Sequence, residues 1–352
     1  MNFSSDNAYG VAPEILEALQ EANLGAAGGY GDDELTARLQ TEMSRVFERD
    51  VIAFPVVTGT AANALALGTL VPPHGAIFCH SEAHIAVDEC GAPAFFTHGA
   101  RLAPIKGGGG KLDPCSVEEE ISRFGKGVVH HSQPAAISIT EATEFGTCYR
   151  VREIEALAAL AKRHGLKLHM DGARFANAIA YLGCTPADAT WRAGVDVLSF
   201  GATKNGALGA DAVVFFHQED TRDFEYRRKK SGHLISKMRF VSAQLVCALE
   251  EGRWLARAAH ANALARLLAG ELAGTAGVEV AHAVEANSVF AYLPDETIVR
   301  LRARGARFYD WGQSSGGRTL VRLVTSFATC ETDIERFVAV VRPELVKSGR
   351  GA

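Results

Sequence analysis

The sequence predicts an α/β protein with a mostly parallel β-sheet wrapped by helices, followed by a smaller α+β domain. From about residue 51 onward, short apolar runs typical of strands alternate with helical patterns, and this alternation favours a parallel sheet. After about Val241 the pattern changes to a long Ala/Leu-rich helix, Ala243 to about Ala269, and then to shorter segments. We therefore expect a large domain over residues 1–245 and a small domain over residues 246–352.

Several elements carry clear boundary signals. Ala12–Ala22 is amphipathic and has a proline in its first turn, where proline is well tolerated. Asp32–Phe47 begins with acidic residues that suit the helix dipole. Arg152–Gly165 ends on a glycine, and the buried strand Leu166–Met170 follows it directly. These segments predict a helical lead-in to the sheet and strand–helix units within it.

The composition indicates a globular protein without affinity for nucleic acids or membranes. Of 352 residues, 47% are hydrophobic and 22% charged, and the formal net charge is −5. The chain has no run of roughly eighteen apolar residues, and its start, MNFSSDNAYG, lacks the pattern of a secretory signal. The seven cysteines form no CxxC pair, so we expect reduced thiols, a cytoplasmic location and no metal site.

Lys204 stands among small residues between two apolar runs. The runs VDVLSF and AVVFF read as buried strands, and the residues between them are mostly Gly, Ala, Thr and Asn. Such residues are too small to cover a long cationic side chain, and a lysine in a dry pocket tends to lose its proton. Lys204 is therefore a candidate nucleophile; the alternative is an ordinary lysine in a surface loop.

Two other strand ends carry groups that suit a phosphorylated cofactor. Gly59 and Thr60 lie where a strand turns into a helix, where free N–H groups favour phosphate, although Thr60 could simply cap the helix. Asp171 follows the strand LKLHM and could pair with a protonated ring nitrogen or cap the next helix. A lysine, an aspartate and a phosphate cradle at neighbouring strand ends match the needs of pyridoxal 5'-phosphate.

His84 follows another predicted strand, in the segment FCHSEAHIAVDECGAP. It could stack on an aromatic cofactor ring and act as a base, or be an ordinary structural histidine. Asp88, one helical turn later, could orient His84 or face solvent.

Taken together, these motifs resemble the low-specificity L-threonine aldolases. That family is in the β-eliminating-lyase branch of the aspartate-aminotransferase-like (fold type I) pyridoxal-phosphate enzymes. The resemblance covers nearly the whole chain, through FSSDNAYG, GGYGDDELTARLQ, TGTAANALAL, SEAHIAVDECGAP, HMDGARFANA, SFGATKNG and LVRLVTSF. It implies a lyase that splits L-threonine, L-allo-threonine or related β-hydroxy-α-amino acids into glycine and an aldehyde.

The resemblance also implies residue roles. Lys204 would carry the cofactor covalently, Asp171 would lie beside its pyridine nitrogen and Arg174 near its phenolic oxygen. Gly59 and Thr60 would hold the phosphate, and His84 would stack on the ring. The substrate would be bound by residues spread along the chain: Ser5, Tyr30, Asp88 and Arg322. The segment RRKKSGHLISKMR is similar to one that reaches a neighbouring subunit's phosphate, here through Lys229 and Arg239, in a homotetramer built from dimers with shared active sites.

One motif departs from the family pattern. Many relatives place a histidine opposite the substrate hydroxyl in a motif that here reads TEATEFGTCYR, where the aligned residue is Glu144. A carboxylate could accept the hydroxyl proton, so either His84 or Glu144 is a candidate general base. The departure leaves open the threonine versus allo-threonine preference, and a phenylserine substrate is an alternative.

Other functions compete with aldol cleavage. The same apparatus could eliminate a β-substituent to give a keto acid and ammonia. An aminotransferase is less favoured, because no second carboxylate-binding pattern is evident. A cofactor-binding scaffold without catalysis is a further alternative. An α/β nucleotide-binding protein would need a G-x-G-x-x-G after the first strand, and the sequence has none there.

Overall fold

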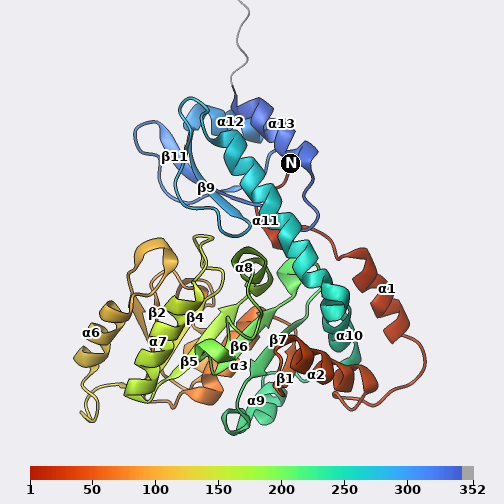
Figure 1. The fold of residues 1–352 in the computed structure, drawn as a ribbon, viewed down its shortest axis with the longest axis vertical. Coiled ribbons are helices and arrows are strands. Elements are labelled where there is room, and N and C mark those ends of the chain that lie inside the picture. The colour runs from red at the N-terminus through yellow and green to blue at the C-terminus, as the bar shows by residue number, and fades with distance from the viewer. Residues whose placement is uncertain (343–352) are drawn as a thin grey trace, which may run out of the picture.

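The computed structural model describes residues 1–342, which form two unequal units joined by a long helix (Figure 1). The large unit is built on a seven-stranded sheet and the small unit on a four-stranded sheet. Helix α11 (Arg253–Leu272) runs between them and packs against α8 (Phe175–Leu182) and α13 (Glu331–Val341). The predicted α/β fold with a smaller α+β domain is confirmed. The boundary between residues 245 and 246 stays a prediction, and residues 343–352 of the expected small domain lie outside the described residues.

The large sheet is mostly parallel. Its strands are β1 (Ile52–Val56), β2 (Gly75–His80), β3 (Arg101–Ile105), β4 (Gln133–Thr140), β5 (Lys167–Gly172), β6 (Val197–Gly201) and β7 (Asp211–Phe215). They lie in the order β1-β7-β6-β5-β4-β2-β3, and β7 is antiparallel to both of its neighbours. The carboxyl ends of the other strands therefore meet at one edge of the sheet, where open α/β sheets bind ligands.

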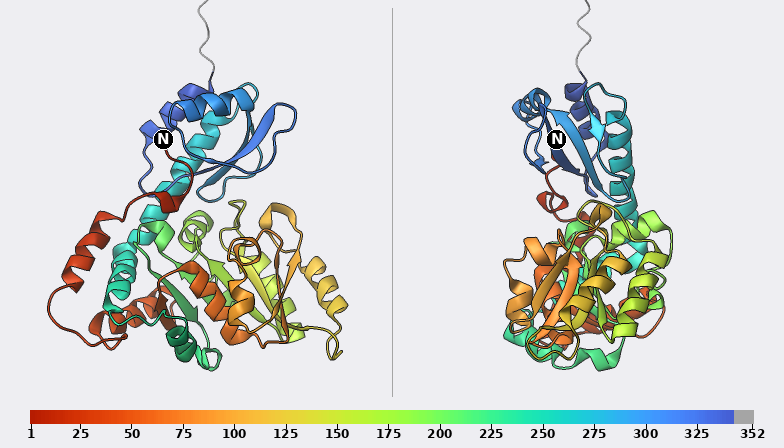
Figure 2. Two further views of the ribbon diagram at one scale, coloured as in Figure 1. Left: turned by 180° about the vertical axis from the view of Figure 1, so that it is seen from behind. Right: turned by 90° about the vertical axis from the view of Figure 1, so that its left-hand side faces the viewer.

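Helices cover both faces of this sheet (Figure 2). The helices of the large unit are α1 (Pro13–Ala22), α2 (Glu34–Val46), α3 (Gly59–Leu70), α4 (His84–Val87), α5 (Ala92–Phe96), α6 (Pro114–Phe124), α7 (Val151–His164), α8, α9 (Phe224–Lys230) and α10 (Arg239–Leu249), and α1 packs on α10. The boundary signals hold: Pro13 opens α1, the Asp33 carboxylate caps α2, and Gly165 ends α7 in a left-handed conformation. Helix α3 is buried almost throughout, which its many alanines allow.

The expected single helix over Ala243–Ala269 is wrong. The structure has two helices, α10 and α11, separated by a tight turn over Glu250–Gly252. Glu251 and Gly252 both have positive φ, 53° and 69°, which ends the hydrogen-bond ladder of one helix before the next begins.

The small unit is an antiparallel sheet with helices on one face. Its strands are β8 (Glu279–Val280), β9 (Ser288–Pro294), β10 (Tyr309–Asp310) and β11 (Arg318–Val324), in the order β10-β11-β9-β8, with α12 (Asp295–Ala303) and α13 beside them. Along β11, Thr319, Val321 and Leu323 are buried and alternate with more exposed residues. Because side chains alternate across a strand, Arg318 and Arg322 share the face away from this core.

The N-terminal segment crosses from one unit to the other. Phe3 lies in the core of the small unit, and its N–H donates to the Arg307 carbonyl at 2.8 Å. Nine residues further along the chain, the N–H of Ala12 donates to the Gly206 carbonyl of the large unit at 2.9 Å. The expected assignment of this segment to the large domain stays a prediction, and its first residues contact the small unit.

Candidate active site

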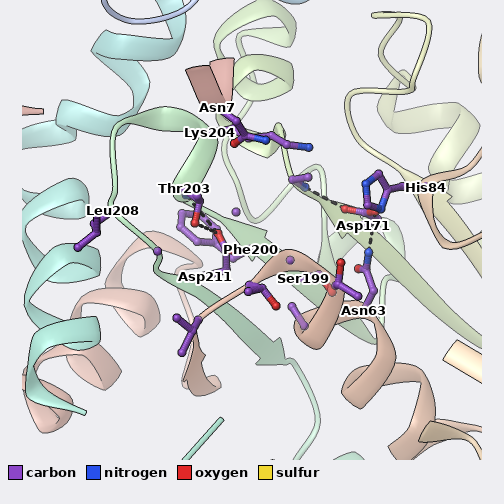
Figure 3. Close-up of a pocket in the computed structure, with 18 residues that line it drawn as sticks. Asn7, Asn63, His84, Asp171, Ser199, Phe200, Thr203, Lys204, Leu208 and Asp211 are labelled. Carbon is purple, nitrogen blue, oxygen red and sulfur yellow. Dashed lines mark hydrogen bonds between the residues drawn. The ribbon is translucent and has the colours of Figure 1, made fainter. Parts of the chain in front are cut away.

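A cavity of about 450 Å³ lies at the carboxyl edge of the large sheet (Figure 3). Five of the predicted site residues line it: Gly59, Thr60, His84, Asp171 and Lys204. They come from the ends of β1, β2, β5 and β6 or from the segments that follow these strands. The parallel arrangement of these strands brings the residues together.

Lys204 lies in a short 3₁₀ turn, Thr203–Asn205, directly after β6. Burial lowers the pKa of its amine, and the nearby Arg174 guanidinium lowers it further, against the opposing charges of Asp6 and others. Among residues 1–342, the Lys204 amine has no hydrogen-bond partner, and only burial and nearby charges shift its pKa. Burial and the Arg174 charge therefore shift this amine toward its neutral, nucleophilic form.

Asp171 is held rigidly at the end of β5. The residue is 3% exposed, and its carboxylate accepts hydrogen bonds from Asn63 Nδ2 at 2.8 Å and from the Ala173 N–H at 3.0 Å (Figure 3). These two donors fix its orientation toward the cavity, on the strand next to the one that leads to Lys204.

The N-terminus of α3 forms the far wall. Thr58 caps the helix by accepting a hydrogen bond from the Ala61 N–H at 3.2 Å. The N–H groups of Gly59 and Thr60, in the first turn, find no acceptor among residues 1–342. A side-chain Cβ added to Gly59 would meet only Asp211 Oδ2, at 3.9 Å, so a phosphate could approach the backbone there. Burial raises the pKa of Asp211, against hydrogen bonds from Thr203 and Ala202.

A chain of hydrogen bonds connects His84 to Asp171. Glu89 Oε1 accepts from His84 Nδ1 at 2.9 Å and from Asn63 Nδ2 at 2.8 Å, and Asn63 also binds Asp171. The hydrogen bond that His84 donates to Glu89 raises the pKa of His84, against the effect of burial. The structure thus corrects the suggestion that Asp88 orients His84: Asp88 is exposed, and the buried neighbour Glu89 does so.

A second buried histidine lies beneath the cavity. His169 is on β5, two residues before Asp171, and is completely buried. Its ring nitrogens lie 2.8 Å from Ser138 Oγ and 3.1 Å from Ser199 Oγ, and Ser199 lines the cavity. Burial lowers the pKa of His169 to about 4, so the ring is neutral at physiological pH.

Arg174 is paired with Asp6 from the N-terminal segment. Arg174 Nε donates to Asp6 Oδ2 at 2.8 Å and Nη2 donates to Oδ1 at 2.9 Å. Although burial acts to raise it, the Arg174 guanidinium holds the pKa of Asp6 below its usual value. The neighbouring Ser5 accepts a hydrogen bond from the Asn7 N–H, and Asn7 lines the cavity. The predicted residues Ser5 and Arg174 therefore lie beside the site.

Arg322 reaches the same region from the small unit. Burial lowers the pKa of Arg322, and so does Arg174, whereas the carboxylates of Glu144 and Asp88 act in the opposite direction. The charges of Glu144 and Asp88 therefore stabilise the protonated form of Arg322, and that of Arg174 destabilises it. The charge of Glu144 also raises the pKa of Lys204, although Glu144 does not line the cavity.

Three predicted residues, Tyr30, Lys229 and Arg239, lie away from the cavity. Lys229 Nζ is 4.2 Å from the centroid of the Tyr30 ring, and Arg239 Nη2 donates to the Gly25 carbonyl at 3.4 Å. None of the three lines the cavity of its own chain.

Sequence reasoning missed Glu89, Asn63, Asp6 and Asn7. A signal existed for Asn63, because it is the one amide within the apolar stretch TAANALALGTL, and a buried amide demands partners. Glu89 was passed over because the helical rule selects position 88, whereas α4 ends at Val87. Among residues 1–342, no group of three or more His, Cys, Asp or Glu side chains could hold a metal ion. No helix in that range has both the length and the apolar character to cross a membrane.

Lys204 after β6, Asp171 on the neighbouring β5 and the N-terminus of α3 line one cavity at the carboxyl edge of this sheet, an arrangement typical of a fold type I pyridoxal-phosphate enzyme. The sequence model of the beta-eliminating lyases matches residues 2–296. The chain belongs to this family, and within it to the low-specificity L-threonine aldolases.

The individual comparisons agree with that assignment. A low specificity L-threonine aldolase of Pseudomonas sp. (strain NCIMB 10558) is 45% identical over 97% of this chain and 96% of its own. The solved threonine aldolase of Leishmania major has a TM-score of 0.90 and 28% identity, covering 97% of this chain and 98% of its own. An aspartate aminotransferase of Rhodobacter sphaeroides, with a TM-score of 0.70 and 19% identity over 97% of this chain and 91% of its own, shares the fold.

Proposed function

We propose that this protein is an aldehyde-lyase that cleaves L-threonine, L-allo-threonine or a related β-hydroxy-α-amino acid to glycine and an aldehyde, using pyridoxal 5'-phosphate. The observation that carries the proposal is the Lys204 amine, which has no hydrogen-bond partner among residues 1–342, in one cavity with the Asp171 carboxylate and the N-terminus of α3. The names of the relatives support the same reaction.

The residues present fit the cofactor. Lys204 would attach its aldehyde, the N–H groups of Gly59 and Thr60 would bind its phosphate, and Asp171 would hold the proton of its ring nitrogen. His84 would lie against the ring, and Arg174 near the phenolic oxygen. When bound, the cofactor supplies an electron sink for the bonds at the substrate Cα.

The remaining residues would bind and deprotonate the substrate. Arg322 and Ser5 would hold its carboxylate, with Tyr30 and Asp88 as further substrate-binding candidates; a guanidinium suits a planar anion. With Nδ1–H donated to Glu89, His84 keeps the lone pair of Nε2 for the proton of the β-hydroxyl. Glu144 is the alternative base, because its charge acts on both Lys204 and Arg322.

Within residues 1–342, Lys204 is the one Lys or Arg that lines the cavity, and it is the expected attachment point of the cofactor rather than a ligand of its phosphate. We propose that Lys229 and Arg239 of a neighbouring copy supply the positive charge that binds the phosphate, in a homotetramer built from two dimers. Mixing two inactive variants, Lys204→Ala and Arg239→Ala, should restore activity in mixed dimers, where one site receives both native residues. Failure to restore activity, with mixed dimers demonstrated by mass, would contradict a shared site.

Two measurements test the proposed function. Borohydride reduction with pyridoxal 5'-phosphate should add the cofactor mass to the peptide that contains Lys204, and Lys204→Ala should prevent it. Incubation with L-threonine should release acetaldehyde and glycine in equal amounts. Keto acid and ammonia in their place would favour β-elimination, which the family name makes the second candidate. A panel with phenylserine, in both enantiomers, would show whether an aryl substituent is preferred.

A further inference from the structure

The outer face of the small sheet carries two arginines in contrasting surroundings. Arg318 and Arg322 both lie on the face of β11 that points away from the small-unit core. Arg318 has a carboxylate partner, Glu279 Oε2 at 3.1 Å, and the ring of Tyr292 at 5.5 Å. The pKa of Arg322 is lowered by burial and by the charge of Arg174, against the charge of Glu144. Among the described residues Arg322 makes no salt bridge, and its buried Nε has no hydrogen-bond partner.

Trp311 covers one face of the Arg322 guanidinium. The guanidinium carbon is 4.4 Å from the centroid of the indole. Trp311 follows β10, and its backbone N–H donates to the Leu320 carbonyl at 2.8 Å. Since Tyr309 pairs with Arg322 and Asp310 with Val321, Trp311 continues the ladder diagonally across from Arg322, on the same face. The ring of Phe290 meets the indole edge-on, with centroids 5.5 Å apart, and fixes its plane.

We propose that Trp311 is a positioning residue for substrate binding: its indole face orients the Arg322 guanidinium so that its N–H groups meet the substrate carboxylate. This inference rests on the proposed role of Arg322 as the carboxylate-binding residue.

The physical reason is the mobility of an unpaired arginine. A long side chain without a carboxylate partner would sample many rotamers, and ordering it on binding would weaken affinity. An aromatic face attracts a guanidinium without using any of its N–H donors, so all of them remain available to an anion. A carboxylate in the position of Trp311 would neutralise Arg322, as Glu279 does for Arg318. An aromatic ring holds it and leaves its charge for the ligand.

The test compares Trp311→Leu with Tyr292→Leu in the holoenzyme, by aldehyde release from L-threonine. Trp311→Leu should raise KM about tenfold and leave kcat within about twofold, because the lost interaction acts on substrate binding. Tyr292→Leu removes the matched aromatic face from Arg318 on the same sheet and should change neither constant. Trp311→Phe keeps an aromatic ring and should recover most of the affinity; it also serves if Trp311→Leu does not fold.

Arg322→Lys separates this inference from the proposed function. If Arg322→Lys leaves KM unchanged, the carboxylate role of Arg322 is wrong and the inference fails with it. If Arg322→Lys raises KM and Trp311→Leu does not, only the role of Trp311 is overturned. In the double variant, Trp311→Leu should have little further effect on KM; a full additional tenfold rise would show that Trp311 acts independently of Arg322.

Discussion

Asp6 and Arg174 form a doubly hydrogen-bonded ion pair in the interior, at 2.8 and 2.9 Å, although they are far apart in sequence. Asn287 of the small unit donates to the same Asp6 carboxylate at 3.0 Å. The N-terminal segment, the end of β5 and the small unit therefore meet at one carboxylate beside Lys204, whose charge also lowers the pKa of Asp6.

Removing the Asp6 carboxylate should strongly destabilise the protein. In Asp6→Ala the Arg174 charge stays buried without a partner, and breaking a buried pair in this way costs about 3–5 kcal/mol. The free energy of unfolding, measured in urea, should fall accordingly. The control Asp188→Ala breaks the exposed pair with Arg192 and should leave the midpoint unchanged. Similar small losses in both variants would show that the buried pair contributes little.

Glu89→Gln should move the acid limb of the pH–rate profile. The hydrogen bond that His84 donates to Glu89 raises the pKa of His84 above its usual 6.5. The imidazole therefore loses its proton, and can act as a base, only at higher pH. Without the carboxylate this pKa falls, and kcat/KM should rise at lower pH than in the parent enzyme. Asp88→Asn should leave the position of the limb unchanged, because Asp88 does not bind His84. A limb that stays in place in Glu89→Gln would point to Glu144 as the base.

His169 should make the protein acid-sensitive. Its pKa is lowered from 6.5 to about 4 in the fold, so between these pH values the unfolded chain takes up a proton that the folded chain does not. This contribution is fully present above pH 6.5 and is lost as the pH falls toward 4, by about 3 kcal/mol in all. His169→Gln should flatten the dependence of Tm on pH in that window. An unchanged slope would mean that His169 is charged in the fold or that other groups dominate.

Two helical glycines should respond in opposite directions to alanine. Gly270, in α11, is exposed and has open space around its Cα, so Gly270→Ala should stabilise the protein by about 0.5–1 kcal/mol through helix propensity. Gly68, in α3, lies against α5, and a Cβ there would approach the Phe96 carbonyl oxygen to 2.7 Å. Gly68→Ala should therefore destabilise by about 1–3 kcal/mol despite the better propensity of alanine. The denaturant midpoint should rise in Gly270→Ala and fall in Gly68→Ala, and shifts in the same direction would contradict the prediction.

Much of the site follows from the sequence because parallel strands bring their ends together. Asp171 and Lys204 each come directly after a buried apolar run, so their meeting at one edge depends only on the sheet being parallel. The family resemblance added residues that no local pattern singles out, such as Arg322.

What the sequence did not reveal depends on contacts between distant segments. The pairing of Asp6 with Arg174 joins two motifs through a fold that local periodicity does not encode. The break between α10 and α11 needs two consecutive positive φ angles, and an Ala/Leu-rich pattern around Glu251 and Gly252 obscures it. Glu89 differs from the expected Asp88 by one position, because a four-residue helix ends before the usual spacing applies.

Because of the path of the first dozen residues, the candidate pocket can form fully only after the C-terminal strands have been synthesised. Phe3 can settle only once the C-terminal strands exist, since Val324 donates its N–H to the Phe3 carbonyl at 2.8 Å. Asn7, a wall of the pocket, is tethered four residues beyond that anchor. A ribosome-bound polypeptide that lacks its last third would consequently lack the strands that anchor Phe3, and with them a fixed position for Asn7.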